Sequence, residues 1–316
     1  MSCANVPARM STPGTARIGW TVGLDMGGTK CLGVLLDPAG VVRARHLIPT
    51  PIGADNVVGA LASTAESLRE QCPTRVLAVG CGVPGLIAHG GVLRYAPHLP
   101  GVVDLPLQAL LAERLGVPVV VDNDNTCAAW AEYRVLESGD PMLYVGFGTG
   151  IGGGFVIDGQ LRRGGHGFAG EIGHMVVQTD GPECVCGRRG CWELYASGNA
   201  IGRLAAAAGL MADGVRVRSL YLAGDPVAVG IIEDFASFVA LGIINLVLTL
   251  DAQIVVLGGG AIGEPEHAEE FLAPIRRHLV DQFGAAASHR PTPELRASHY
   301  GPVAGAVGAA LLARTP

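Results

Sequence analysis

Apolar and polar positions along the first third of the chain predict a strand meander followed by alternating helices and strands. Residues 18–49 contain two apolar runs around a glycine turn, then a second turn and another apolar run. This pattern predicts three consecutive strands. A helical pattern extends from about Asn56 to Gln71, and residues 105–116 predict a helix that ends at a glycine. A buried strand at 117–124 then leads into a helix at 125–135.

The same pattern starts again near Gly139. Residues 142–164 contain an apolar strand, a glycine turn, a second apolar strand and another turn, and Val145–Phe147 corresponds to Val22–Leu24 in the first copy. A long helix to Leu250, a strand and a terminal helix follow. This weak internal repeat predicts a duplicated α/β fold of two domains with a cleft between them.

The repeat also predicts the domain organisation. We expect a smaller N-terminal α/β domain at 18–137 and a larger C-terminal one at 138–316, after a polar leader at 1–17 that lacks an apolar core and is predicted to be disordered. The most apolar stretch, 235–250, is shorter than the roughly 18 residues that a membrane-spanning helix needs. We therefore expect a buried core helix, no membrane association and a cytoplasmic protein.

Composition narrows the possible functions. The 316 residues carry a formal net charge of −6, which disfavours nucleic-acid binding because nucleic-acid-binding proteins usually present a basic face. The chain has eight cysteines but no visible secretory signal, so we expect a reducing compartment without disulfides.

Three of these cysteines lie within eight positions, in the stretch Glu-Cys-Val-Cys-Gly-Arg-Arg-Gly-Cys-Trp-Glu at 183–193. A thioredoxin-type centre would need Cys-x-x-Cys at a helix start, which this stretch lacks. Together with His174, the residues Cys184, Cys186 and Cys191 form the Cys₃His set of a closed structural zinc site. Such a site would draw Glu171 and Glu193 together, beside the imidazole, in an arrangement suited to the hydroxyls of a polyol.

Three glycine-rich loops predict phosphate and nucleotide binding. Asp-Met-Gly-Gly-Thr-Lys at 25–30 and Gly-Thr-Gly-Ile-Gly-Gly-Gly at 148–154 lie at matching turns of the two copies, where glycines allow backbone N–H groups to converge on an anion. The loop at 257–261 follows a strand and could approach a flat adenosine. The Walker A spacing is absent, and the segment after 148–154 is a strand, which argues against a dinucleotide fold.

A run of four polar residues, 122–125, lies where a buried strand meets a helix. Ligands of α/β folds gather at such strand ends. One of the four is expected to cap the helix. A carboxylate here could accept a proton from a substrate hydroxyl, while a neighbouring amide fixes that hydroxyl in place.

Together these motifs resemble the ROK family of bacterial sugar kinases, in family order from about Thr21 to the C-terminus. The most specific match is Cys-x-Cys-Gly-x-x-Gly-Cys-x-Glu. The resemblance implies the actin-like, hexokinase-type (ribonuclease H-like) duplicated α/β fold. It also implies ATP-dependent phosphorylation of a hexose, usually at the 6-hydroxyl, in a homodimer or homotetramer with Mg²⁺ and structural Zn²⁺.

The resemblance assigns a role to each matching residue. Asp124 would be the general base, and His174 would bind both zinc and sugar. The other implied sugar ligands are Gly85, His98, Asn123, Glu171 and Glu193. The implied ligands of the phosphates and Mg²⁺ are Asp25, Gly27, Gly28, Thr29, Lys30, Gly148, Thr149 and Gly150. Gly258 and Gly259 would approach the adenosine.

Two departures from the family pattern affect the choice of sugar. His98 stands where glucokinases of the family usually have a sugar-contacting Asn, and the family's frequent Asn-Asp-Ala-Asn is here Asn-Asp-Asn-Thr at 123–126. Glucose is the first expectation; an amino or N-acetylated hexose, fructose or a glucose-like cyclitol are alternatives. A sugar-sensing regulator or a non-catalytic sugar-binding protein is the alternative from another class. The seventeen residues before the first predicted strand are too few for a helix-turn-helix domain.

Overall fold

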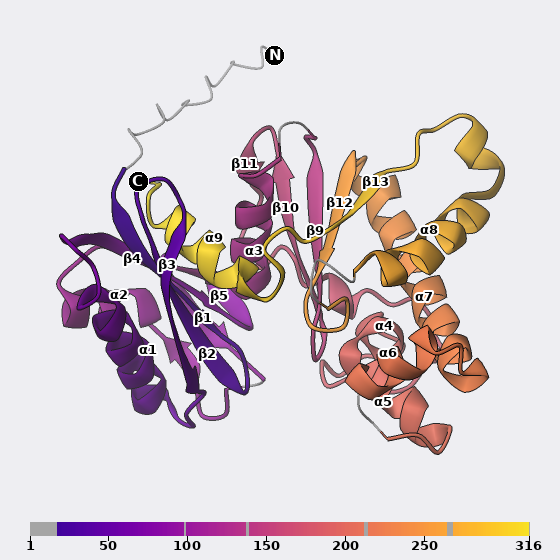
Figure 1. Cartoon of the computed structure of the whole chain (residues 1–316), viewed down its shortest axis with the longest axis horizontal. Helices are drawn as coiled ribbons and strands as arrows, with labels where there is room; N and C mark the ends of the chain where they lie inside the picture. The colour runs from indigo at the N-terminus through magenta and orange to yellow at the C-terminus, as the bar shows by residue number, and fades with distance from the viewer. Residues whose placement is uncertain (1–17, 98, 137–138, 212–213, 264–267, 316) are drawn as a thin grey trace, which may run out of the picture.

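The computed structural model describes residues 18–97, 99–136, 139–211, 214–263 and 268–315. The predicted leader at 1–17 and the predicted sugar ligand His98 lie outside the described residues. Two five-stranded sheets stand side by side with helices α3 and α9 between them, as Figure 1 shows. The two sheets and the helices around them are called here the first and the second lobe.

The sheet of the first lobe has the strand order β3-β2-β1-β4-β8. Its first three strands form the predicted meander, in which β2 runs antiparallel to both β1 and β3. The other two strands are parallel to β1. The bounds are β1 Trp20–Met26, β2 Lys30–Leu36, β3 Val42–Pro49, β4 Val76–Val83 and β8 Val119–Asn123.

The sheet of the second lobe repeats this arrangement in the order β11-β10-β9-β12-β13. Again the central strand, β9, has an antiparallel neighbour on one side and parallel strands on the other. The bounds are β9 Met142–Phe147, β10 Ile151–Ile157, β11 Gln160–Leu161, β12 Ile254–Gly258 and β13 Glu294–Ala297. The repeat predicted from glycine turns is therefore a repeat of whole sheets.

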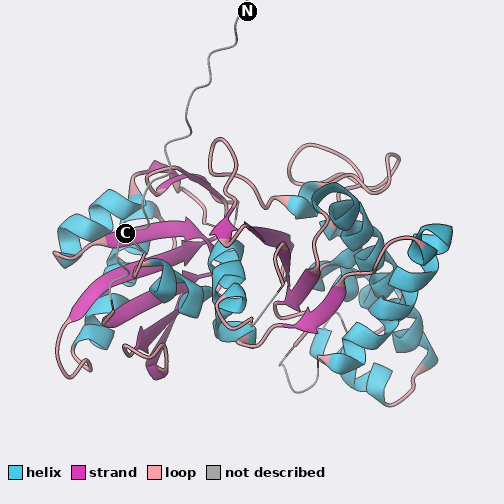
Figure 2. Cartoon of the chain, turned by 90° about the horizontal axis from the view of Figure 1, so that it is seen from above, coloured by secondary structure: helices cyan, strands magenta, loops and turns pink. Residues whose placement is uncertain are grey.

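Each lobe also has helices of its own on the outer side (Figure 2). The first has α1 (Ala54–Arg69), α2 (Leu107–Leu115) and a small sheet of β5 (Leu86–Ala88), β6 (Val92–Tyr95) and β7 (Val103–Leu105). The second lobe has α4 (Glu193–Ala196), α5 (Gly198–Ala207), α6 (Gly214–Leu222), α7 (Pro226–Leu250) and α8 (Glu269–Phe283).

Helix α7 carries the most apolar stretch of the sequence. By length and composition alone it could cross a membrane. Its apolar side chains instead join the core of the second lobe, where Phe235, Val239 and Ile243 are fully buried. The indole of Trp192 packs against Gly242, where a Cβ atom would lie 2.1 Å from the ring. The prediction of a core helix is confirmed.

The helices between the sheets are exchanged between the lobes. Helix α3 (Asp124–Tyr133) follows β8 of the first lobe but packs on β9 and β10, while α9 (Ala304–Leu312) follows β13 of the second lobe but packs on β1 and β4. The two helices also pack on each other. A Cβ atom at Gly308 would lie 1.7 Å from the carbonyl oxygen of Cys127, so glycine is required for this close approach. The domain boundary predicted from the sequence, with one domain at 18–137 and the other at 138–316, stays a prediction.

Candidate active site

The run of four polar residues at 122–125 lies at the junction of β8 and α3, and the structure separates their roles. Asn123 is the N-cap, because its Oδ1 accepts hydrogen bonds from the backbone N–H groups of Asn125 (2.9 Å) and Thr126 (3.2 Å). Its Nδ2 donates to the carbonyl oxygen of Gly85 at 3.3 Å. Two predicted sugar ligands, Asn123 and Gly85, therefore touch.

Asp122 is committed to an ion pair between the lobes. Its Oδ2 accepts from Nε of Arg163 at 2.6 Å, and its Oδ1 accepts from the backbone N–H of Asn123 at 2.9 Å. The next carboxylate, Asp124, begins α3, and its Oδ1 accepts from both the backbone N–H and the side-chain Nδ2 of Asn125, each at 2.9 Å. Asp124, the predicted general base, is thus the first residue of α3.

A second carboxylate, Asp25, comes from the end of β1. Desolvation raises its pKa from 3.8 to about 7, and the negative charge of Asp124 acts in the same direction, while Lys30 opposes both. The first turn of α9 lies against it, since a Cβ atom at Gly305 would be 2.5 Å from Asp25 Oδ2. The structure therefore brings Asp25 close to Asp124.

The rest of the first predicted phosphate loop forms the turn between β1 and β2. The backbone N–H of Gly27 donates to the carbonyl oxygen of Lys30 at 2.9 Å, and the hydroxyl of Thr50 donates to the carbonyl oxygen of Gly27 at 2.7 Å. Gly28, Thr29 and Lys30 are exposed. The hydrogen bond from Thr50 thus holds the base of the turn, while the residues at its tip are exposed to solvent.

The second phosphate loop and the predicted adenosine loop are neighbours in the second lobe. Between β9 and β10, the N–H of Gly148 donates to the carbonyl oxygen of Gly150 at 3.0 Å, and Thr149 is exposed at the tip. Gly259, with a φ of 87°, sits directly on Phe147, where a Cβ atom would lie 2.5 Å from the carbonyl oxygen. Gly258 ends β12 just before it. The two loops therefore lie side by side at the ends of neighbouring strands.

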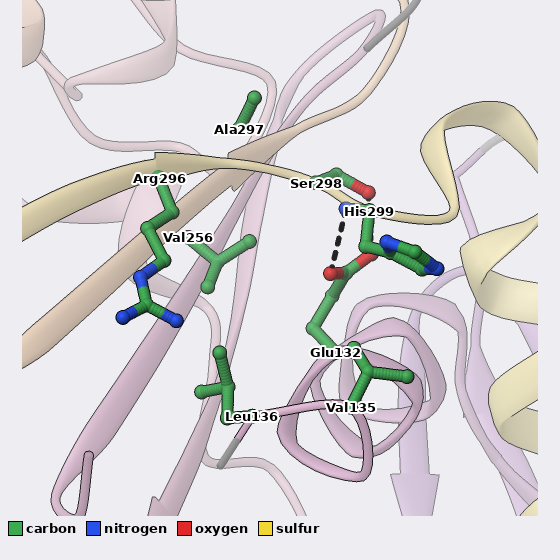
Figure 3. Close-up of a pocket in the computed structure, with 8 residues that line it drawn as sticks. All are labelled: Glu132, Val135, Leu136, Val256, Arg296, Ala297, Ser298 and His299. Atoms are coloured by element: carbon green, nitrogen blue, oxygen red, sulfur yellow. Dashed lines mark hydrogen bonds between the residues drawn. The ribbon is translucent and has the colours of Figure 1, made fainter. Parts of the chain in front are cut away.

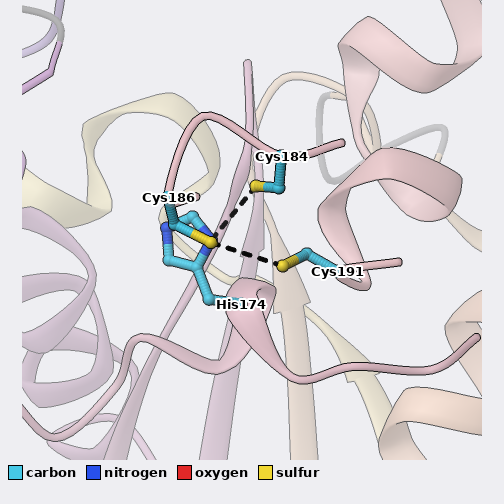
Figure 4. Close-up of side chains that lie close together, drawn as sticks. All are labelled: His174, Cys184, Cys186 and Cys191. Carbon is cyan, nitrogen blue, oxygen red and sulfur yellow. Dashed lines mark hydrogen bonds between the residues drawn. The ribbon is translucent and has the colours of Figure 1, made fainter. Parts of the chain in front are cut away.

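The predicted zinc ligands are brought together (Figure 4). One ligand atom from each of His174, Cys184, Cys186 and Cys191 lies within 4.8 Å of all the others. The sulfurs of Cys186 and Cys191 are 3.5 Å apart, and Cys184 Sγ is 3.6 Å from His174 Nδ1. Tetrahedral zinc with Zn–S bonds of about 2.3 Å places its ligand atoms about 3.5–3.8 Å apart. The donor set fits zinc in both chemistry and spacing.

The predicted sugar ligands adjoin this cluster. His174 ends a short 3₁₀ turn, Ile172–His174; its Nε2 is 3.9 Å from Glu171 Oε2, while its Nδ1 is 3.4 Å from Glu193 Oε1. Glu193 Oε1 also lies 3.2 Å from Cys184 Sγ. On the far side of the same carboxylate, a Cβ atom at Gly150 would lie 2.5 Å from Glu193 Oε2. Glu193 therefore joins the cysteine cluster to the second phosphate loop.

The pKa of Glu171 reflects its burial and the carboxylates around it. Desolvation raises it, His174 opposes the shift, and the charges of Asp124 and Glu193 raise it further. The two lobes thus contribute Asp25 and Asp124 on one side, and Glu171 and Glu193 on the other, to one acidic site. Such a site favours a divalent cation and a ligand rich in hydroxyl groups.

A cavity of about 310 Å³ lies elsewhere, at the C-terminal end of α3 (Figure 3). Helix α3 rises about 1.5 Å per residue, so its two ends are roughly 14 Å apart. None of the predicted site residues that the structure describes lines the cavity. Its lining residues are Glu132, Val135, Leu136, Val256, Arg296, Ala297, Ser298 and His299.

Three contacts of the site were not foreseen from the sequence: the ion pair of Asp122 with Arg163, the approach of Gly305 to Asp25, and the amide of Asn125 on Asp124. The first joins the two lobes and the second joins β1 to α9, so both connect residues far apart in the sequence and neither could be predicted from local spacing. For Asn125 a signal was present, because four polar residues in a row exceed what a helix cap needs.

Known proteins are similar to this chain in sequence and in fold. The family model described as "ROK family" matches residues 21–316. The glucokinase of Streptomyces coelicolor is 35% identical over an alignment of 320 positions, which covers 95% of this chain and 99% of that protein. The N-acetylmannosamine kinase of Citrobacter koseri is 38% identical over 299 residues, covering 93% and 98%.

A solved structure agrees with both. The ROK family glucokinase from Streptomyces griseus, in complex with glucose and AMPPNP, superposes with a TM-score of 0.84 at 34% identity, covering 94% of this chain and 99% of that one. The ROK hexokinase from Thermus thermophilus has a TM-score of 0.77 at 37% identity, covering 93% and 97%. The predicted duplicated, hexokinase-type α/β fold is confirmed.

Proposed function

The chain belongs to the ROK family, and we propose that it transfers the γ-phosphoryl group of ATP to a hydroxyl of a hexose, with the 6-hydroxyl of glucose as the first candidate. The observation that carries this proposal is the set of carboxylates that the structure gathers beside the glycine loops. Glu193 lies against Gly150 of the second phosphate loop, and the charge of Asp124 acts on the neighbouring Glu171, which supports a sugar held by the two glutamates beside Asp124.

In the proposed reaction, Asp124 takes the proton of the sugar hydroxyl. The hydroxyl oxygen forms a bond to the γ-phosphorus as the bond from that phosphorus to the bridging oxygen breaks, and ADP leaves with the bonding electrons. The sugar phosphate and a proton on Asp124 remain. Since phosphoryl transfer depends largely on positioning and charge, the glycine loops at 25–30 and 148–150 would hold the phosphates in line with the hydroxyl.

Asp25 suits the Mg²⁺ that accompanies ATP. Burial and the nearby charge of Asp124 make its carboxylate costly to ionise, as its raised pKa shows, and a divalent cation would offset that cost. Mg²⁺ usually keeps several waters and binds through one or two carboxylates plus the phosphates, which needs no larger cage of protein ligands. Asp25 would hold it at the first loop, and the bound ion would neutralise charge on the phosphates.

The zinc site would organise the sugar pocket and take no part in the chemistry. With Nδ1 of His174 turned toward the cysteines, its Nε2 faces Glu171 and would donate to a sugar hydroxyl. Glu193, in contact with Cys184, would accept from a second hydroxyl. A closed set of four protein ligands is typical of structural zinc.

A coupled assay of ADP production tests the function. We expect ATP-dependent phosphorylation in a panel of glucose, mannose, N-acetylmannosamine, fructose and a cyclitol, with glucose giving the highest kcat/KM. N-Acetylmannosamine is the second candidate, because a relative 38% identical to this chain is a kinase for it. A protein that binds sugars without consuming ATP would overturn the proposal in favour of a non-catalytic role.

Asp124→Asn tests the base. The amide keeps the size of the side chain but cannot take the proton, and general-base catalysis contributes about 10²–10⁴-fold. We expect kcat to fall at least ~100-fold while the sugar Kd changes little. An amide variant within a few-fold of the parent would remove Asp124 from this role.

A further inference from the structure

We propose that Asn125 is a positioning residue, whose side-chain amide orients the Asp124 carboxylate and fastens it to the β9–β10 hairpin on which α3 packs. The inference rests on the proposed function, in which Asp124 is the base. It concerns how that base is held, and it arises from contacts that the four-residue polar run alone did not indicate.

The first observation is the pair of hydrogen bonds on one carboxylate oxygen. Asp124 Oδ1 accepts from the backbone N–H of Asn125 and from its side-chain Nδ2, both at 2.9 Å. Hydrogen bonds to a carboxylate are charge-assisted and are roughly twice as strong as neutral ones. Two donors in different directions restrain rotation of the carboxylate about its Cβ–Cγ bond, so its orientation is set before a sugar binds.

The second observation is the space that the Asn125 amide occupies. Gly146 on β9 and Gly152 on β10 are direct partners in the antiparallel pair. A Cβ atom at Gly146 would lie 2.0 Å from Asn125 Oδ1, and one at Gly152 would lie 2.2 Å from Asn125 Nδ2. Any larger residue on either strand would displace the amide, so the two glycines form a notch that receives it.

The notch links the two halves of the proposed reaction. The hairpin that carries it also carries the second phosphate loop, Gly148–Gly150, between the same two strands. Through Asn125, the base on α3 is therefore set against the strands that would position ATP. A misplacement of about 1 Å of a catalytic group can lower the rate about 10²-fold. Loss of the Asn125 side chain should therefore lower kcat.

Asn125→Ala is the direct test, because it empties the notch and removes the side-chain donor. We expect kcat to fall about tenfold or more, with the KM values for sugar and ATP changed less than about threefold. Asn125→Asp should lower kcat as much, since the aspartate side chain fills the notch but has no N–H to donate. Asn245→Ala, at an exposed position of α7, is the matched control and should behave as the parent.

A double-mutant cycle separates positioning from folding. In the Asp124→Asn background, Asn125→Ala should cause no further loss, because the two residues act as one unit. An equal loss in both backgrounds, a rise in KM with unchanged kcat, or a fully active Asn125→Asp would each overturn the inference.

The same data distinguish two kinds of failure. An active parent, an impaired Asp124→Asn and an unaffected Asn125→Ala would overturn only the role of Asn125. A parent that phosphorylates no sugar, or an Asp124→Asn variant as active as the parent, would overturn the proposed function and this inference together.

Discussion

At the scale of single residues, the site depends on glycines as much as on the acids between them. Gly305 is one example, since its missing side chain leaves the room that Asp25 fills at the start of α9. The sequence presents this glycine only as part of a small-residue helix. Its role follows from the return of α9 to the first sheet, which no local pattern contains.

Gly305→Ala should therefore impair the enzyme without unfolding it. The new Cβ atom would lie 2.5 Å from Asp25 Oδ2 and push the carboxylate away from the phosphates. We expect kcat/KM for ATP to fall about 10- to 100-fold, while the unfolding midpoint changes little. Gly230→Ala, on α7 with open space around the new atom, is the control. Wild-type kinetics in Gly305→Ala would show that Asp25 does not need this position.

The raised pKa of Asp25 predicts a pH-dependent cost to stability. The folded protein holds a proton on Asp25 up to about pH 7, whereas the unfolded chain releases it near 3.8. Without bound Mg²⁺ and ATP, this carboxyl therefore contributes stability below about pH 4 that is lost as the pH rises to about 7. The difference between 3.8 and about 7, at about 1.4 kcal/mol per tenfold change in proton affinity, sets an upper limit of about 4 kcal/mol.

The measurement compares Asp25→Asn with the parent in EDTA by urea unfolding at pH 4 and pH 8. Because Asp25 is partly exposed, we expect about 2 kcal/mol in favour of the variant at pH 8 and nearly equal stabilities at pH 4. Equal stabilities at both pH values would mean that the charged carboxylate is well solvated in the folded protein.

At the scale of elements, much of the architecture was readable in the sequence. The meander, the helix predicted from about Asn56 to Gln71 and observed as α1 at Ala54–Arg69, and the end of α7 at Leu250 all follow from apolar spacing and turns. The zinc ligands could be identified because ligand spacing is local. The contact of Glu193 with the second phosphate loop could not be predicted, since it depends on how the start of α4 lies against Gly150 in the folded chain.

The metal site gives a prediction at this scale. We expect one Zn²⁺ per chain by elemental analysis, and loss of a ligand in Cys184→Ser should free the loop that carries Glu193. The sugar KM should then rise about 10- to 100-fold, since losses of this size follow when the residues supporting a metal site are removed. Cys72→Ser, at a free cysteine outside the cluster, should be neutral. Full activity in a zinc-free preparation would refute the site.

At the scale of the whole molecule, the repeat in the sequence predicted two similar halves, and the structure adds that they exchange helices. Helix α3 leaves the first lobe to pack on the second sheet, and α9 returns from the second lobe to the first. Sequence periodicity places both helices correctly along the chain. It does not predict the sheet on which each helix packs, because either sheet offers an apolar face.

Hydrogen bonds hold the two exchanged helices together at the C-terminal end of α3, away from the candidate active site. The Glu132 carboxylate, only 2% exposed, accepts hydrogen bonds from Ser298 Oγ at 2.5 Å and from the backbone N–H groups of His299 at 2.8 Å and Tyr300 at 3.1 Å. These residues form the connection from β13 to α9. One side chain thus holds both passages of the chain between the lobes, and Figure 3 shows it beside the cavity.

Glu132→Ala should consequently destabilise the whole molecule more than the site. The substitution leaves three hydrogen-bond donors without their acceptor. Each buried donor that loses its hydrogen bond lowers the free energy of unfolding by about 1–3 kcal/mol. Water from the adjoining cavity of about 310 Å³ can satisfy part of them, so we expect a loss of about 2–4 kcal/mol in urea unfolding. Glu132→Gln keeps one acceptor oxygen and should lose less. Glu66→Ala, whose exposed pair with Arg69 contributes little, is the control. If Glu132→Ala matched that control, the lobes would be held by the packing of α3 on α9 alone, and the carboxylate would have no part in joining them.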